Sequence, residues 1–152
     1  MQFRTLSSPL TAAGVVLILT SGLGGCRPAS RYQPVRLAQA SGIVLEGGAP
    51  VERVRVMLHP VNPPPGQVLL PVATTNEDGI FHLTTYENGD GAPPGEYRVV
   101  ITCPVLANPE VKGLQPPVDK YKGRYADPEK SPWTVTIEEG VNELEPFIVE
   151  VN

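Results

Sequence analysis

Two clusters of acidic, amide and glycine residues within NEDGIFHLTTYENGDG (76–91) have the composition of a calcium-binding loop. An EF-hand loop needs acidic or amide ligands at its positions 1, 3 and 5, glycine at 6 and glutamate at 12. With Gly79 or Gly91 at position 6, positions 1 and 12 hold only threonines or tyrosines. Because both terminal carboxylates are missing, the spacing excludes an EF-hand.

The same clusters are explained by two tight turns at the ends of a predicted strand over 80–85. Asn, Asp and Gly tolerate positive φ, and the two polar side chains cap their own backbone. Six strand residues at about 3.3 Å each would hold the clusters roughly 20 Å apart, too far to share one ion. We therefore expect turns, with no metal and no cofactor. Weak calcium binding by one loop alone is the remaining alternative.

The other reactive residue types do not form a recognisable catalytic set. Strand alternation places His59 and His82 on polar faces, and neither has a chelating partner two residues away. Alternation puts Cys103 on the face of Tyr97 and Ile101, which predicts a buried, inert thiol. No GxSxG, HExxH or glycine-rich phosphate loop occurs in the sequence. These patterns predict a protein that is not an enzyme.

The N-terminal residues predict export and lipid attachment. The apolar run AAGVVLILT (12–20) is too short for a spanning helix, which needs about 20 residues, but suits a secretory signal. LGGC (23–26) resembles the bacterial lipobox. The resemblance implies removal of a signal peptide, 1–25, and fatty acylation, such as palmitate, on Cys26. The alternative is an ordinary secretory signal followed by an incidental cysteine.

Charge divides the remaining chain into two parts. Residues 27–40 contain three arginines and no acid, whereas all 16 acidic residues begin at Glu46. With 8 basic residues, 41–152 carries a net charge of −8. We expect a basic, flexible tether over 26–40, attracted to anionic headgroups, and an acidic domain over 41–152. Nothing in this balance suggests a nucleic-acid partner. Arg27, in place of an aspartate after the lipidated cysteine, favours the outer over the inner membrane.

The sequence of the domain predicts seven short strands separated by turns. Eighteen prolines and fifteen glycines punctuate runs rich in Val, Ile, Leu, Tyr and Thr. The expected strands are 41–46, 51–60, 67–75, 80–85, 95–103, 132–139 and 143–151. Alternation predicts that the following side chains face the core: Val54, Val56, Leu58, Trp133, Val135, Ile137, Phe147, Val149 and Val151. The pattern predicts an all-β fold, a β-sandwich.

Three segments resemble the carboxypeptidase regulatory-like domain: SGIVLEGGAPVERVRVMLHP, ATTNEDGIFHL and GEYRVVI. GRYADPEKSPWTVTIEEGVNELEPFIV resembles the C-terminal part of small envelope lipoproteins that carry this domain alone. The resemblance covers 41–152 and implies a seven-stranded transthyretin-like (prealbumin-like) sandwich. Arg53 departs from the alanine common in the family. The related 5-hydroxyisourate hydrolase ends in Tyr-Arg-Gly-Ser, whereas this chain ends VEVN, which argues against that activity.

The segment YKGRYADPEKSP (121–132) is the candidate recognition element. Tyr121, Arg124 and Tyr125 combine aromatic area with a planar donor group, a composition used in binding loops. The alternative is a crossover loop held down by tyrosines that pack on the sandwich. Together with the implied lipid on Cys26, the sequence predicts a non-enzymatic, membrane-anchored envelope protein. It would act as an interaction or accessory module for an unknown envelope protein. The alternative function is a carbohydrate-binding module that recognises an envelope glycan.

Overall fold

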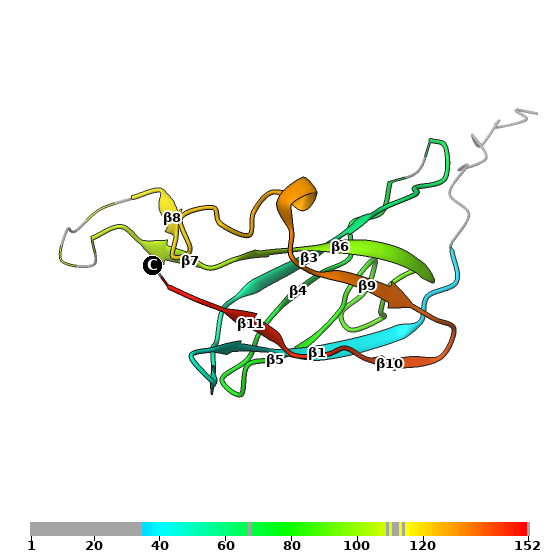
Figure 1. Cartoon of the computed structure of the whole chain (residues 1–152), viewed down its shortest axis with the longest axis horizontal. Helices are drawn as coiled ribbons and strands as arrows, with labels where there is room; N and C mark the ends of the chain where they lie inside the picture. The colour runs from blue at the N-terminus through cyan, green and yellow to red at the C-terminus, as the bar shows by residue number, and fades with distance from the viewer. Residues whose placement is uncertain (1–34, 67, 109, 111–112, 114, 152) are drawn as a thin grey trace, which may run out of the picture. The chain divides into compact units, whose positions relative to one another are not determined.

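The computed structural model describes residues 35–66, 68–108, 110, 113 and 115–151. They belong to one compact unit. The predicted signal peptide (1–25), Cys26 and tether residues 27–34 lie outside the described residues. The described part is all-β (Figure 1). It has eleven strands and one short 3-10 helix, η1 (Pro128–Lys130). This confirms the all-β part of the predicted fold.

The first sheet is built around β1 (Gln39–Glu46). One side of β1 pairs antiparallel with β2 (Ala49–Pro50) and β5 (Ile80–His82). The other side pairs in parallel with β10 (Val141–Glu143) and β11 (Phe147–Val149). The first and last strands of the domain are therefore direct neighbours.

The second sheet has the order β4-β3-β6-β9, with every pair antiparallel. Its strands are β4 (Val72–Thr74), β3 (Arg55–Pro60), β6 (Gly95–Thr102) and β9 (Thr134–Ile137). A separate hairpin of β7 (Pro104–Leu106) and β8 (Pro117–Asp119) follows directly after β6.

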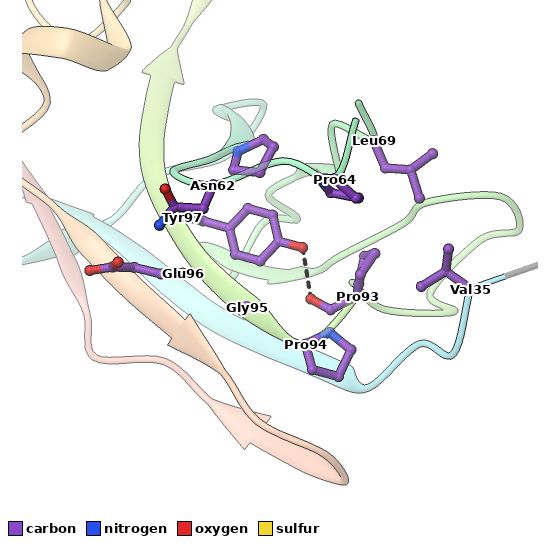
Figure 2. A pocket seen from close by; sticks show the side chains of 10 residues that line it. Val35, Asn62, Pro64, Leu69, Pro93, Pro94, Gly95, Glu96 and Tyr97 are labelled. Carbon is purple, nitrogen blue, oxygen red and sulfur yellow. Dashed lines mark hydrogen bonds between the residues drawn. The ribbon is translucent and has the colours of Figure 1, made fainter. Parts of the chain in front are cut away.

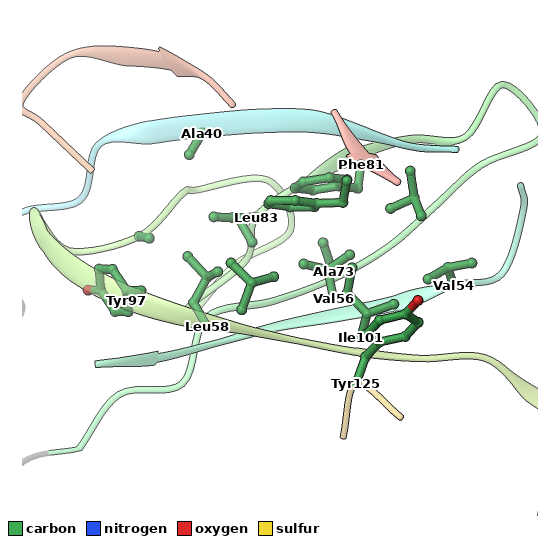
Figure 3. Close-up of a cluster of buried hydrophobic side chains, with 14 of the residues drawn as sticks. Ala40, Val54, Val56, Leu58, Ala73, Phe81, Leu83, Tyr97, Ile101 and Tyr125 are labelled. Carbon is green, nitrogen blue, oxygen red and sulfur yellow. The ribbon is translucent and has the colours of Figure 1, made fainter. Parts of the chain in front are cut away.

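The hydrophobic core takes side chains from both sheets, as strand alternation predicts (Figure 3). Val56 and Leu58 of β3 are fully buried, as is Ile101 of β6. From the first sheet, Phe81 and Phe147 stack with ring centroids 5.9 Å apart. Each such side chain contributes about 1.5–3 kcal/mol on burial, so this shared layer is the main source of stability.

Each of the seven predicted strands overlaps an observed one, and β2, β7, β8 and β10 are additional short strands. The predicted strand 51–60 is too long at its start, because β3 begins only at Arg55. The Thr75 hydroxyl accepts a hydrogen bond from Val54 N (2.9 Å) and donates one to Val51 O (2.7 Å). Arg53, between them, has φ +60° and is exposed. This local turn replaces the first residues of the strand.

The predicted strand 143–151 is divided between the end of β10 and β11. Phe147 and Val149 are buried as predicted, but Val151 is 49% exposed, so that part of the prediction is wrong. In the parallel register Val149 lies opposite Glu46, the last residue of β1. Val151 therefore extends past the end of its neighbouring strand.

The fold begins earlier than the predicted boundary at residue 41. Ala38 and Ala40 are buried, and Ala38 exchanges two backbone hydrogen bonds with Ala92, of 2.8 and 3.0 Å. Gly91 has φ +97°, and a Cβ there would collide with the carbonyl group of Ala38. Glycine is therefore required at 91 for the chain to enter the sandwich, and the predicted tether is shortened at its C-terminal end.

Candidate functional site

The first acidic and glycine cluster forms a turn closed by its own side chain. Asn76 Oδ1 accepts hydrogen bonds from the N–H groups of Asp78 (3.0 Å) and Ile80 (2.9 Å). Gly79 adopts φ +70° and donates its N–H to Asn76 O at 3.0 Å. The Asn76 amide oxygen is thus used within the turn, and the turn interpretation of this cluster is confirmed.

The second cluster is organised by the Asp90 carboxylate. It accepts hydrogen bonds from the backbone N–H groups of Thr85 (2.7 Å), Tyr86 (2.9 Å) and Glu87 (2.8 Å). Desolvation alone would raise the pKa of Asp90, but these hydrogen bonds favour the charged form and together lower the pKa below its ordinary value. The turn interpretation is confirmed here too. Within the described ranges, no three His, Cys, Asp or Glu side chains group as a metal site.

The histidines and the cysteine differ in exposure. His82 is exposed and His59 is half-buried. Cys103 is 4% exposed, which confirms its predicted place in the core. Burial raises the pKa of the Cys103 thiol above its ordinary value, although nearby Lys120 opposes the shift. A buried thiol with a raised pKa is a poor nucleophile.

A polar cluster fixes the candidate recognition segment to β1. Lys120 Nζ lies 2.8 and 2.9 Å from the two carboxylate oxygens of Glu46, and the Tyr121 hydroxyl donates to the same carboxylate at 3.0 Å. Tyr121 itself is 4% exposed. Its burial, together with this hydrogen bond, raises the pKa of Tyr121. The phenol therefore stays protonated and serves as a donor.

Tyr125 is held in a similar way by the C-terminal segment. Its ring is 8% exposed and lies 5.0 Å from the ring of Trp133, and its hydroxyl accepts from Glu150 N at 3.2 Å. Arg124 lies over the Tyr125 ring, and its guanidinium is 3.4 Å from the Glu150 carboxylate. The structure thus gives both tyrosines a packing role. Partner binding by Tyr121, Arg124 and Tyr125 stays a prediction, for which Arg124 is the more accessible group.

Trp133 is only half-buried, although the sequence predicts a core residue. It packs against the edge of the core and contacts Phe147, with ring centroids 5.5 Å apart. Its ring also lines an open groove of about 290 Å³, together with Glu143 and Glu145. The alternation pattern gives the correct side of the strand but not this exposure, because β9 lies at the edge of its sheet.

A pocket of about 270 Å³ lies where the described chain begins (Figure 2). Its lining residues are mainly apolar and come from four chain segments: Val35, Pro60, Asn62, Pro64, Leu69, Pro93, Pro94, Gly95, Glu96 and Tyr97. The buried Tyr97 donates its hydroxyl to Pro93 O at 2.7 Å and so fixes one wall. The sequence analysis missed this pocket. The two proline clusters NPPP and APPG were the signal that could have indicated it.

No helix among the described residues has the length and apolar character needed to cross a membrane.

No family model and no curated protein matches the sequence. Among solved structures, the chain is similar to a 9R-lipoxygenase from Cyanothece PCC8801, with 12% identity and a TM-score of 0.39. The match covers 79% of this chain and 18% of that one. It is also similar to an (S)-allantoin synthase, with 19% identity, a TM-score of 0.40, and coverage of 76% of this chain and 42% of that one. The chain thus spans less than half of either structure, and at these TM-scores neither likeness bears on function.

Proposed function

We propose that this chain is a non-enzymatic, lipid-anchored protein of the cell envelope that acts as an interaction or accessory module. The observation that carries the proposal is Leu23-Gly24-Gly25-Cys26, placed after an apolar run of signal length and shortly before the β domain. Two or more acyl chains on one cysteine give stable membrane attachment where a single chain gives only marginal binding. The outer membrane is the favoured location.

We further propose that the domain is a transthyretin-like sandwich of seven principal strands. The support is the position of the three resembling segments. SGIVLEGGAPVERVRVMLHP spans β1 to β3, ATTNEDGIFHL runs from β4 to β5, and GEYRVVI falls in β6.

A role without catalysis is supported by how the polar side chains are used. Asn76 and Asp90 accept hydrogen bonds from turn backbone, and Glu46 is occupied by Lys120 and Tyr121. These acceptor groups are thus engaged in ordering the chain.

The lipid anchor is tested by labelling cells with a clickable palmitate analogue and fractionating their membranes. We expect label and membrane association for the wild-type chain and for Cys103→Ala, and loss of both for Cys26→Ala. Cys103→Ala is a matched control, because it removes the other cysteine of the chain and leaves the lipobox intact. Label retained in Cys26→Ala, or absent from the wild type, would refute the anchor.

The accessory role is tested by cross-linking the tagged protein in intact cells. We expect one reproducible partner that is captured by the wild-type chain and lost with Cys26→Ala. If the same proteins are captured whether or not the chain is anchored, the contact does not depend on the membrane, and that part of the proposal fails.

Glycan binding is a second candidate, favoured by one observation. Trp133 lines an open groove beside Glu143 and Glu145, and an aromatic ring flanked by polar groups is a platform for a sugar. Trp133 is the only tryptophan in the chain, so its fluorescence reports on this groove alone. Titration with envelope glycan fragments should quench or shift the emission at saturable concentration. Unchanged emission at millimolar fragment would remove this candidate.

A further inference from the structure

Exposed apolar residues line the pocket at the start of the described chain and occur on the loop that forms one of its walls. Val35, Pro64, Leu69 and Pro93 line the pocket, and the loop 61–70 adds the exposed side chains Val61, Val68 and Leu70. Val68 is 62% exposed. We call this surface the tether-end face. Apolar side chains gathered in this way mark a contact surface more often than isolated ones do.

The loop that carries this face is fixed at its base. Val61 N donates to Glu96 O at 2.9 Å, and Leu58 N donates to Pro71 O at 2.9 Å, which ties both ends of the loop to the second sheet. The Tyr97 hydroxyl holds Pro93 on the facing wall. The apolar side chains are thus presented by an ordered framework.

Charge distinguishes this face from the rest of the domain. The segments 61–70 and 92–95 contain no charged residue, although residues 41–152 carry a net charge of −8. Glu96 is the charged residue among those lining the pocket, and Figure 2 shows its side chain directed away from Val35 and Leu69. Anionic headgroups repel acidic surfaces, so these uncharged segments can approach a membrane at a lower electrostatic cost than an acidic surface can.

The short length of chain between the proposed anchor at Cys26 and the domain also favours this face. Nine Cα-to-Cα steps separate Cys26 from Val35, which in any conformation keeps the two within about 32 Å. β6 runs from Gly95, in the pocket, to Thr102, and its eight residues span about 25 Å. The exposed apolar residues of the β7–β8 hairpin therefore begin about one strand length away from the pocket, at which the described chain begins.

We propose that the tether-end face rests on the lipid surface and orients the domain on the membrane. Val68 and its neighbours enter the interfacial layer, and the acidic remainder of the domain points away from the headgroups. This inference rests on the proposed lipid anchor at Cys26, and it adds a defined orientation to it.

The test uses the full lipidated chain in vesicles of phosphatidylethanolamine and phosphatidylglycerol. An environment-sensitive NBD dye is attached to Val68→Cys and, as a matched control, to Ile148→Cys on β11. These two side chains are 62% and 61% exposed, so they start from equal contact with water. Cys103 is buried and Cys26 is acylated in the proposed anchor, so native labelling reports on the introduced thiol.

We expect the emission of the dye at position 68 to shift to the blue. Its quenching by iodide should fall severalfold, and nitroxide-labelled lipids should quench it. The dye at 148 should change in none of these. Flotation with the vesicles reads out the anchor independently. If neither protein floats, the anchor itself fails. If both float and the two dyes respond alike, only the orientation is refuted.

A Cys26→Ala chain that carries the dye at position 68 distinguishes contact with lipid from contact with a second copy of the chain. Without vesicles, its dye should stay accessible to iodide at every protein concentration. Protection that grows with protein concentration would show that a second copy of the chain covers the face, and would overturn the proposal.

Discussion

Replacing Asp90 by asparagine tests whether the second acidic cluster is a turn held by its own carboxylate. Asp90 accepts three backbone hydrogen bonds, of 2.7, 2.9 and 2.8 Å, one on Oδ1 and two on Oδ2. An asparagine amide has one acceptor oxygen and must present its NH₂ group at the other position. The substitution therefore leaves at least one N–H facing a donor and removes the charge from the remaining bonds.

The expected loss of stability follows from the number of hydrogen bonds that the substitution weakens. A hydrogen bond to a charged acceptor contributes about 1.5–3 kcal/mol, and the partly exposed loop lets water replace some of what is lost. We expect Asp90→Asn to lower the free energy of unfolding by about 1–2 kcal/mol at pH 7. Urea denaturation measures this change directly. Asp78→Asn, in the other turn and fully at the surface, is the matched control, with an expected change within about 0.5 kcal/mol.

The effect of Asp90→Asn must also depend on pH with a definite sign. The folded-state pKa of Asp90 is lower than its ordinary value of 3.8, so the charged form is favoured by folding. Its stabilisation is fully present above that value and is lost as pH falls through the lower, folded-state pKa. The wild type and Asp90→Asn should therefore differ by a constant amount near neutral pH and converge in acid. A difference that persists unchanged at low pH, or a loss no larger than that of Asp78→Asn, would refute the assigned role. A saturable rise in melting temperature with micromolar calcium would refute the turn as the sole role of the loop.

Three further changes test the packing. Gly89→Ala should lower the free energy of unfolding by about 1–2 kcal/mol, because alanine disfavours the positive φ at this position but its Cβ meets no other atom. Gly91→Ala should lower the free energy of unfolding by at least about 2 kcal/mol more than Gly89→Ala does. The added Cβ also displaces the backbone of Ala38, which is joined to Ala92 by two hydrogen bonds. Equal losses of stability for the two variants in thermal or urea unfolding would contradict the collision. Tyr125→Ala should destabilise by about 3–5 kcal/mol and Arg124→Ala by less than about 1 kcal/mol. A stable Tyr125→Ala domain that fails to bind a partner would instead support recognition. Cys103 should resist thiol reagents in the native protein and react within minutes in urea, and rapid native labelling would show that its burial is transient.

Local pattern predicts this fold well where a residue's environment is set by its own strand. Alternation alone places Val56, Leu58 and Ile101 in the core, because each lies in a continuous ladder between β3 and β6. It also predicts the burial of Val54 correctly, but it places Val54 within the strand, whereas β3 begins only at Arg55. Its N–H donates to the hydroxyl of Thr75, twenty-one residues away, a contact that no local pattern contains.

The candidate sites also divide into features set by local sequence and features set by distant parts of the chain. The turn roles of Asn76 and Asp90 follow from residue type, because those side chains bond to nearby backbone. The partners of Tyr121 and Tyr125 are Glu46 and Glu150, each from a distant part of the chain. The pocket at the tether end likewise depends on four segments meeting, and only their proline content was visible beforehand.

The parallel pairing of β1 with β10 and β11 places a condition on when the chain can fold. β1 is the first strand of the domain, and one of its edges is completed only by residues 141–149. A chain that is threaded through a pore N-terminus first cannot close this sheet until residues 141–149 have emerged. Such long-range pairings form slowly, so a chain that emerges in this way stays open along this edge of β1 until then. The same connection that closes the finished sheet thus delays its formation until β10 and β11 are available.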